Sequence, residues 1–218
     1  MATLIFIPWH WNTPACYDAF IDALSAYGFT GATVILPYPG CDAATYDFVD
    51  EITLLKETLT GLSRIRRDVI LVLHPQGKRR SLSAKDLGNT QRAERKLQSG
   101  VVRMIFFMAF MSPIGFNPTN GDEEVAPDSA EFQMERGIVS VNDDESMKVF
   151  LQYLPASEAQ HWAARMLPQS VGVFWSTSNY TGWQNIPSKY LLHSDNRLFR
   201  VPYAHYKLEH TRRVSGVF

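Results

Sequence analysis

Two histidines stand where proton-transfer chemistry could occur. His10 follows a short apolar run at residues 4–7, and His74 ends the apolar run at residues 69–74. An imidazole titrates near neutral pH, so it can donate or accept a proton or hold a substrate oxygen by a hydrogen bond. His10 and His74 are therefore the first candidates for acid–base catalysis, provided that the fold brings the ends of the two runs together.

The rest of the chain predicts how these histidines are positioned. Runs of β-branched and aromatic residues predict strands, and the stretches between them carry apolar residues at helical spacing. This alternation is typical of an α/β fold, in which helices cover both faces of a mostly parallel sheet. The predicted strands are residues 4–7, 32–36, 69–74, 103–110 and 189–193, and the first two connecting helices are residues 15–27 and 46–63. The carboxyl ends of such strands share one edge, where ligands bind.

Size and composition limit the classes of function. The chain of 218 residues suffices for one sizeable core, so we expect a single domain spanning residues 1–218. Its net charge of −1 gives no field that would attract nucleic acid or an anionic membrane. No stretch reaches membrane-spanning length, and the first residues predict a strand rather than a secretion signal. With only two cysteines, we expect a cytoplasmic protein whose partner is a small neutral molecule.

The middle of the chain predicts an insertion over the sheet. Residues 112–129 are rich in Pro, Gly, Asn and acidic residues, which is typical of a surface excursion. Short amphipathic helices are expected after it. They are residues 145–153, 157–166 and 168–175. We therefore expect residues 112–185 to form a small helical cap, after which the chain returns to the sheet near Ile186.

A densely basic segment spans residues 78–98. A solvent-exposed helix and loop explains it, and a phosphate-binding patch is the alternative. Ser81 and Ser83 lie within it, but no histidine can be assigned as their base, so the sequence disfavours either as a relocated nucleophile. The six histidines lack the spacing of metal ligands and no C-x-x-C occurs, so we expect no metal and no cofactor.

Several stretches occur in an order that resembles a known family. Residues 69–77, an apolar run followed by HPQG, resemble the strand-to-helix turn that presents a nucleophilic serine in G-x-S-x-G proteins. The other stretches are IPWHWNTP at residues 7–14, GVVR at 100–103, LPASEAQHW at 154–162, LPQS at 167–170 and IPSKYL at 186–191. Together they resemble a branch of the α/β-hydrolase superfamily, namely small fungal and bacterial proteins with a P-G-x-W-H-T-P-E opening and an H-S-x-G-G elbow. The likeness covers nearly the whole chain and implies an α/β-hydrolase fold.

The resemblance also implies a catalytic triad that is incomplete. Pro75 stands where the family has its serine, and proline offers neither a hydroxyl nor a backbone N–H. The N–H groups of the oxyanion hole map onto Gln76 and His10, with Trp9 in place of a family glycine. The acid of the triad maps onto Asp195. Too few residues follow Asp195 for the strand and loop that carry the family's histidine, so we expect a C-terminally shortened, triad-deficient member.

Aromatic side chains are expected to line the space between sheet and cap. The residues expected to contact a substrate are Trp9, Trp11, Tyr38, Gln76, Tyr153, Trp162, Trp175 and Trp183. Any one of these aromatics could instead fill the core or hold the cap to the sheet. An aromatic-rich chamber suits a hydrophobic polycyclic or polyene substrate, which can be folded into a reactive shape without a covalent intermediate.

The sequence thus favours a non-hydrolytic enzyme of the cyclase, pericyclase or lyase type. We expect it to act on a hydrophobic intermediate of secondary metabolism, with His10, His74 and Asp195 as catalytic candidates. Two alternatives remain open: a non-catalytic ligand-binding or accessory protein, and a residual esterase-type hydrolase that uses a histidine as general base. A missing last strand would leave an exposed sheet edge, which predicts a possible homodimer through residues 214–218 or through the cap aromatics.

Overall fold

The structure is a computed structural model of the chain. The described residues are 2–37, 48–74, 80–109, 114, 130–174, 180–197, 201–202, 205–206 and 208–209.

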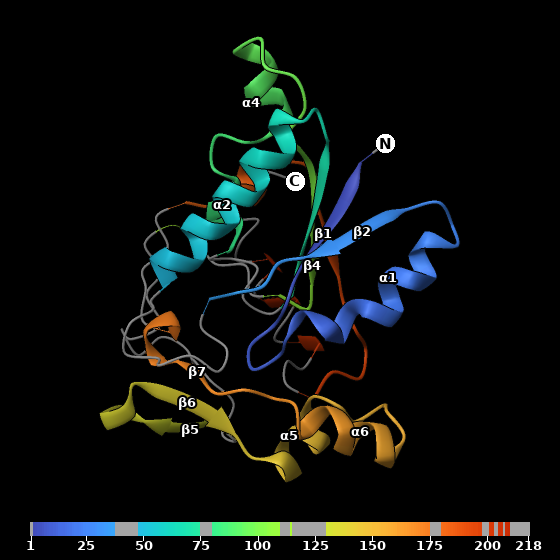
Figure 1. The fold of residues 1–218 in the computed structure, drawn as a ribbon, viewed down its shortest axis with the longest axis vertical. Coiled ribbons are helices and arrows are strands. Elements are labelled where there is room, and N and C mark those ends of the chain that lie inside the picture. The colour runs from blue at the N-terminus through green and yellow to red at the C-terminus, as the bar shows by residue number, and fades with distance from the viewer. Residues whose placement is uncertain are drawn as a thin grey trace.

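Five strands form one parallel sheet in the order β2-β1-β3-β4-β8 (Figure 1). They are β1 (Thr3–Ile7), β2 (Thr30–Thr33), β3 (Val69–Leu73), β4 (Val101–Phe107) and β8 (Ser188–Leu191). Ile5 lies opposite Leu71, and Leu71 lies opposite Met104, so β3 is paired on both sides. All five carboxyl ends point to one edge. This confirms the predicted α/β fold with its mostly parallel sheet.

Helices cover opposite faces of this sheet (Figure 1). Successive side chains of a strand point to opposite faces. Ile5 and Ile7 accordingly belong to the main buried cluster together with Leu55 and Leu59 of α2 (Phe48–Arg64). Phe6 points the other way, and its ring lies 5.6 Å from that of Phe20 on α1 (Asp18–Ser25). Both helices that the apolar spacing predicts therefore exist. Leu55 and Leu59 of α2 are buried as the spacing requires, whereas Phe20 on α1 is still 53% exposed.

The basic segment is more deeply buried than its composition predicts. It forms η3 (Ser81–Ala84) and α4 (Asn89–Glu94), and α4 lies at the far end of the sheet from the cap (Figure 1). Arg80 is 0% exposed, and Arg92 is also buried, with its Nε donating to the carbonyl oxygen of Ser99 at 2.5 Å. The expectation of a uniformly solvent-exposed helix and loop is therefore wrong at these two arginines, because each has an internal acceptor.

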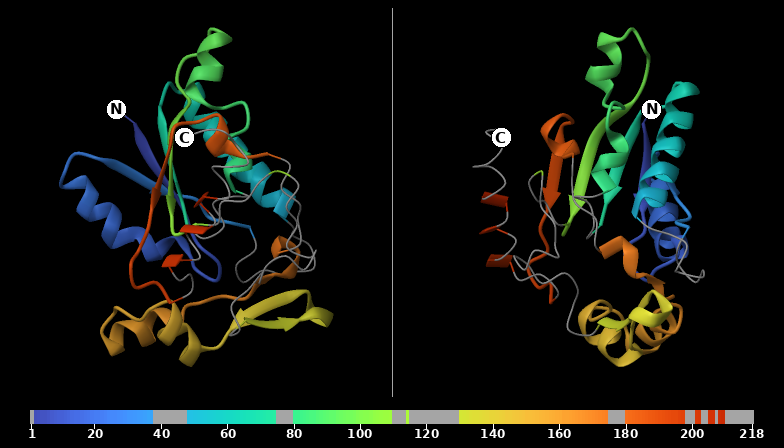
Figure 2. Two further views of the ribbon diagram at one scale, coloured as in Figure 1. Left: turned by 180° about the vertical axis from the view of Figure 1, so that it is seen from behind. Right: turned by 90° about the vertical axis from the view of Figure 1, so that its left-hand side faces the viewer.

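The cap region contains a small antiparallel sheet as well as helices. Its elements are β5 (Ala130–Gln133), η5 (Met134–Arg136), β6 (Ile138–Val141), α5 (Asp143–Val149), α6 (Ala156–Ala163), β7 (Gln169–Ser170) and η6 (Val171–Phe174). The helix expected at residues 168–175 is wrong at its start, since Gln169 pairs with Val139 in the order β5-β6-β7, and only η6 is helical within that range. These elements lie together beyond the carboxyl ends of the large sheet (Figures 1 and 2). The cap therefore faces the edge where the two histidines were expected.

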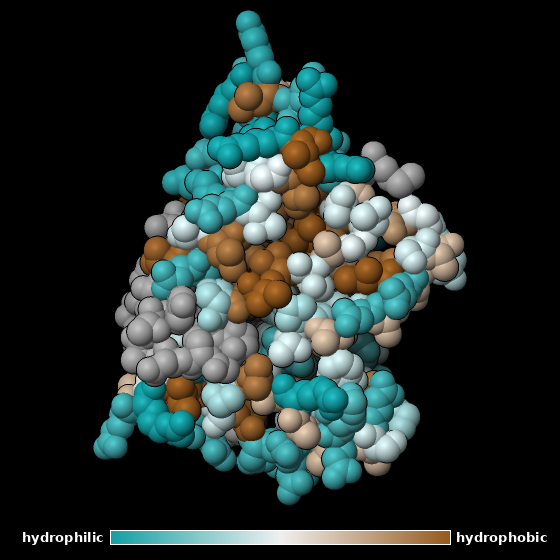
Figure 3. Space-filling view, in the orientation of Figure 1, coloured by the Kyte–Doolittle hydropathy of each residue, from teal (hydrophilic) through white to brown (hydrophobic). Residues whose placement is uncertain are grey.

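The chain re-enters the sheet through η7 (Gly182–Gln184) and β8, at the end of the strand order. Beyond β8, Leu208 packs against the main buried cluster. The space-filling view shows apolar surface between α2 and α1 and polar surface over α4 (Figure 3). Within the described ranges, none of the helices is long and apolar enough to cross a membrane.

Candidate active site

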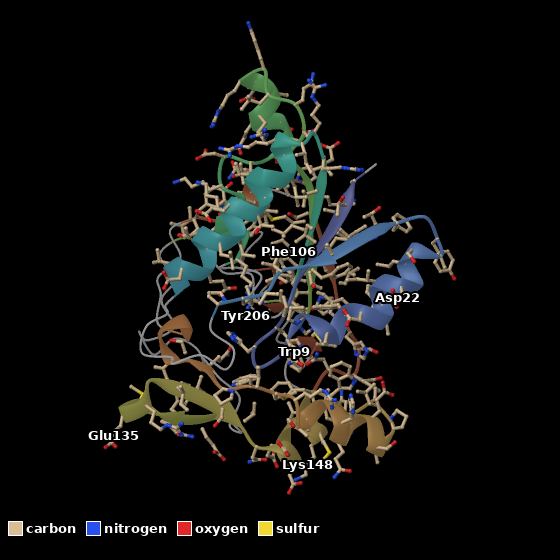
Figure 4. The ribbon with its side chains drawn as sticks, viewed as in Figure 1. Trp9, Asp22, Phe106, Glu135, Lys148 and Tyr206 are labelled. Atoms are coloured by element: carbon tan, nitrogen blue, oxygen red, sulfur yellow. The ribbon has the colours of Figure 1, made fainter. Side chains whose placement is uncertain are left out.

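Four rings meet where three strands of the large sheet end. Trp9 follows β1, His74 follows β3, Phe107 ends β4, and Phe150 is the C-cap of α5. The ring of Trp9 lies 5.4 Å from that of His74 and 4.7 Å from that of Phe150, both edge to face. His74 in turn stacks on Phe107 at 5.3 Å. We call these four residues the strand-end cluster, and Figure 4 shows its Trp9 between the sheet and the cap.

The cluster is only partly buried. Phe107 is 39% exposed, and Trp9, His74 and Phe150 have intermediate exposure. By contrast, Phe106, the neighbour of Phe107 on β4, is 0% exposed in the core. The carboxyl ends of parallel strands are where open α/β sheets bind ligands. Partly exposed aromatic faces at this edge are therefore available to contact an apolar molecule.

His74 is held as a neutral imidazole. Burial, and secondarily the Arg80 guanidinium, lowers its pKa from 6.5 to about 3. Among the residues that the structure describes, none hydrogen-bonds to its buried Nδ1. At neutral pH the ring can therefore accept a proton or a hydrogen bond but carries no positive charge.

Arg80 lies beneath this edge and links three segments. Its Nε donates to a carboxylate oxygen of Glu51 on α2 at 2.5 Å. Its Nη1 donates to the carbonyl oxygen of Pro8, which directly precedes Trp9. Arg80 and Glu51 were not predicted as site residues. Two charged residues that pair across 29 positions leave no local pattern in the sequence.

The loop after β1 is fastened to the cap through Trp11. Its indole Nε1 donates to the carbonyl oxygen of Val139 at 3.1 Å, and its own carbonyl oxygen accepts from the N–H of Leu167 at 2.8 Å. Trp11 is 3% exposed. These contacts give Trp11 a structural role in holding the loop to the cap, and its contact with a substrate stays a prediction from the sequence.

His10 lies in the same loop and is 6% exposed. Its Nδ1 is hydrogen-bonded to Nε2 of Gln169 on β7, and its carbonyl oxygen accepts from Nδ2 of Asn12 at 3.0 Å. His10 and His74 thus flank Trp9, one along the chain and one across a ring contact. The strand-end positions that the sequence predicted for both histidines are the positions observed.

Comparisons with known proteins agree with this architecture. No family model matches the sequence. The curated protein Alpha/beta hydrolase nvfD of Aspergillus novofumigatus is 24% identical over 200 residues, which are 88% of this chain and 77% of that protein. The crystal structure of polyneuridine aldehyde esterase superposes with a TM-score of 0.74, at 13% identity, over 100% of this chain and 88% of that one. This is an α/β-hydrolase-fold protein.

Two further solved structures share the fold. An extracellular alpha/beta-hydrolase from a Paenibacillus species gives a TM-score of 0.72 at 15% identity, over 97% of this chain and 86% of that one. The methylesterase protein MES16 from Arabidopsis gives 0.68 at 18% identity, over 96% and 85%. At these identities the likeness concerns the fold.

In this α/β-hydrolase-fold protein, the predicted acid lies in a loop fastened to the cap. Asp195 follows β8, is exposed, and accepts through its main-chain oxygen from Tyr153 and Gln152, each at 2.9 Å. The N–H of His193 points to Sδ of Met108 at 2.9 Å. The structure thus brings Asp195 and Tyr153 together beyond the end of β8, a strand that β4 separates from β3.

The remaining candidates are less central or not described. Trp183 is 3% exposed and belongs to the main buried cluster, and Trp162 packs in a second cluster between α5 and α6. Tyr38, Gln76 and Trp175 lie outside the described residues, as does Pro75. The loss of the nucleophile therefore stays a prediction from the sequence.

Other reactive groups in the described chain are poorly placed for catalysis. Ser81 is 0% exposed, and its Oγ accepts from the N–H of Gly182 at 3.1 Å. Ser83 is also 0% exposed and donates to the carbonyl oxygen of Arg80. Burial raises the pKa of Cys16 to about 12, which keeps it as an unreactive thiol. In the described ranges no group of three or more His, Cys, Asp or Glu side chains converges as a metal site would require.

Proposed function

We propose that this α/β-hydrolase-fold protein is an enzyme that converts a hydrophobic small molecule without forming an acyl-enzyme. The reaction class that fits is a cyclisation, a pericyclic rearrangement or a lyase-type elimination of a secondary-metabolite intermediate. The observation that carries the proposal is the strand-end cluster, in which partly exposed aromatic rings surround the neutral imidazole of His74.

The aromatic rings and the imidazole have separate tasks in this proposal. Aromatic faces bind apolar substrates through burial and stacking, and they fix the substrate in a shape close to that of the transition state. A neutral imidazole within such a surface can take a proton from the bound substrate. A cyclisation or an elimination can use both, and neither needs a nucleophilic hydroxyl, which the proline at position 75 does not provide.

The test is turnover of a metabolite mixture by the purified protein. We expect a hydrophobic component of an extract from the source organism to be depleted and a new product to form, as followed by liquid chromatography with mass spectrometry. His74→Asn and Trp9→Leu should each abolish or strongly reduce the conversion. His161→Asn, on the exposed surface of α6, and Tyr27→Leu, at a tyrosine that is 81% exposed, are controls that should convert normally. Equal conversion by all four variants would refute the proposal.

Residual hydrolysis is a second candidate that a specific observation favours. A neutral His74 could act as general base on water, and the solved structures similar to this chain include esterases. Activated chromogenic esters test this reading, because their cleavage should disappear in His74→Asn and persist in His161→Asn. If a ligand raises the melting temperature but neither product nor cleavage appears, the protein is a non-catalytic binding or accessory protein instead.

The assembly proposed for the protein is a homodimer in the cytoplasm. The support for dimerisation is that β8 ends the strand order of the large sheet within the described residues, and an unpaired strand edge favours pairing with a second copy. Light scattering should give twice the mass of 24.7 kDa, and a mass of one chain at all concentrations would contradict the dimer. Imaging of a tagged protein checks the compartment.

A further inference from the structure

Gln169 contacts the loop after β1 with both ends of its side-chain amide. The residue is 0% exposed and lies on β7, which pairs with β6 in the cap. Its Oε1 accepts from the backbone N–H of Trp11 at 3.4 Å, and its Nε2 is hydrogen-bonded to Nδ1 of His10. One buried amide from the cap thus bridges two consecutive residues of the candidate site.

The orientation of this amide follows from its partners. A backbone N–H can only donate, so the atom of Gln169 that faces Trp11 must be the acceptor oxygen. The amide nitrogen then faces His10. Rotating the amide by half a turn would set N–H against N–H at Trp11, at the cost of leaving a buried donor unsatisfied.

The same logic fixes the proton on His10. An amide nitrogen can only donate, so Nδ1 of His10 must offer its lone pair. A neutral imidazole carries one proton, and which nitrogen bears it is set by the hydrogen bond that the other nitrogen makes. With Nδ1 as the acceptor, the proton resides on Nε2.

The loop is rigid enough to enforce this choice. Trp11 has a φ of +64°, a conformation that a bulky residue adopts only when its surroundings hold it there. The surroundings include the bonds from Trp11 to Val139 and Leu167, and the Asn12 side chain that donates to the His10 carbonyl oxygen. These bonds hold the backbone of the loop in place, so that the His10 side chain starts from a fixed point opposite Gln169.

We propose that Gln169 is a positioning residue that holds His10 as the Nε2–H tautomer. This rests on the proposed function and deepens it, because it gives His10, beside Trp9, a proton on Nε2 while His74 remains the acceptor. Because β7 supplies the amide, the cap decides which nitrogen of a residue in the loop after β1 bears the proton.

The experiment is nitrogen-15 NMR of the histidine side chains in the intact protein. Long-range nitrogen–proton correlations distinguish a protonated from an unprotonated imidazole nitrogen, and the His10→Asn spectrum identifies the signals of His10. We expect His10 in the unchanged protein to show an unprotonated Nδ1 and a protonated Nε2. A protonated Nδ1 there would overturn the proposal.

Two substitutions sharpen the result. Gln169→Glu replaces the donor by a carboxylate that can only accept, so the Nδ1 signal should change to that of a protonated nitrogen. Gln160→Glu makes the same change on the exposed surface of α6 and should leave the His10 signals as they were. An unchanged Nδ1 signal in folded Gln169→Glu would also contradict the proposal. If Gln169→Glu does not fold, the spectrum of the unchanged protein decides alone.

The NMR spectrum of His10 needs no substrate, so it tests the tautomer independently of the proposed function. A protein that shows the expected tautomer but converts nothing refutes the enzymatic proposal and keeps the role of Gln169. A protein that converts substrate with Nδ1 protonated refutes the role of Gln169 and keeps the enzyme. Where turnover is found, Gln169→Glu should lower it at least tenfold, and Gln169→Asn should not restore it because the shorter side chain cannot reach both partners.

Discussion

Arg80 and Glu51 form an ion pair in which Nε of the arginine donates to a carboxylate oxygen at 2.5 Å. The exposed fractions of the two side chains are 0% and 2%. The same guanidinium holds the carbonyl oxygen of Pro8 and contributes to the lowered pKa of His74. One buried cation therefore joins α2, the loop after β1 and the candidate base.

Glu51→Gln should strongly destabilise the fold, because it leaves the Arg80 charge buried without its counter-charge. The expected loss in the free energy of unfolding is about 3–5 kcal/mol, measured by urea denaturation. The matched control is Asp86→Asn, which breaks the Arg95–Asp86 pair, whose side chains are 55% and 47% exposed. That loss should stay below about 1 kcal/mol. Equal losses in the two variants would contradict the buried role of Arg80.

The stability of the protein should depend on pH through His74. Its pKa in the folded protein is about 3, below its ordinary value of 6.5, so between these values the unfolded chain binds a proton that the folded chain does not. The free energy of unfolding should therefore fall as the pH drops from 6.5 toward 3, by at most about 1.4 kcal/mol per pH unit from this group. Denaturation at several pH values measures the slope.

His74→Asn should remove that part of the slope, whatever it does to the absolute stability. His161→Asn, on the exposed surface of α6, controls for the general effect of deleting a histidine. If the slope of His74→Asn equals that of the unchanged protein, His74 is not the buried neutral group described here.

Trp11→Phe should loosen the cap. The substitution keeps an aromatic ring but removes the indole N–H that donates to the carbonyl oxygen of Val139, a residue that is 0% exposed. Leaving a buried acceptor unpaired costs about 1–3 kcal/mol. Hydrogen exchange should accelerate in β6 and β7, whereas Trp162→Phe should leave these strands protected. Unchanged exchange in β6 and β7 would show that this bond does not hold the cap.

Tyr153→Phe should free the loop that carries Asp195. The tyrosine hydroxyl donates to the main-chain oxygen of Asp195 from an exposed position, so the loss of overall stability should be small. The effect should be local, seen as faster hydrogen exchange at residues 193–197. Tyr27→Phe, at a tyrosine that is 81% exposed on the opposite part of the molecule, should change neither quantity.

The large sheet was predictable because its signals are local. Four of its five strands coincide with a predicted apolar run, with small offsets. The run at residues 32–36 only overlaps the end of β2, which is Thr30–Thr33, and its Val34 and Leu36 are buried beyond the last paired residue. Periodicity likewise placed both helices that cover the sheet.

The cap was predicted less well because its strands are short and polar. β5 carries Glu131 and Gln133. The hairpin between β5 and β6 turns at Gly137, which has a φ of +62°, but a single glycine does not predict a hairpin. Pro168 and the apolar residues after it indicated a helix at residues 168–175, yet pairing of Gln169 with Val139 overrides that local preference.

The predicted strand ends located the residues of the candidate site, but the sequence did not predict the residues that bond to them. His10 and His74 lie where their strands stop. Gln169 reaches His10 across 159 positions and Arg80 reaches Glu51 across 29, and a single sequence carries no pattern for either pair. The burial of Arg80 was also hard to predict because Arg80 belongs to a run of basic residues, which normally indicates a solvent-exposed surface.

The distance along the chain between His10 and Gln169 sets an order of events during synthesis. A ribosome releases β1 through β4 with their helices long before it releases β7, and contacts of such large separation form late because closing the intervening loop costs chain entropy. A nascent chain that stops short of Gln169 holds the four strands and the aromatic rings of Trp9, His74 and Phe107, but its first histidine has no fixed proton. The bond between His10 and Gln169 can therefore form only after residue 169 has been synthesised.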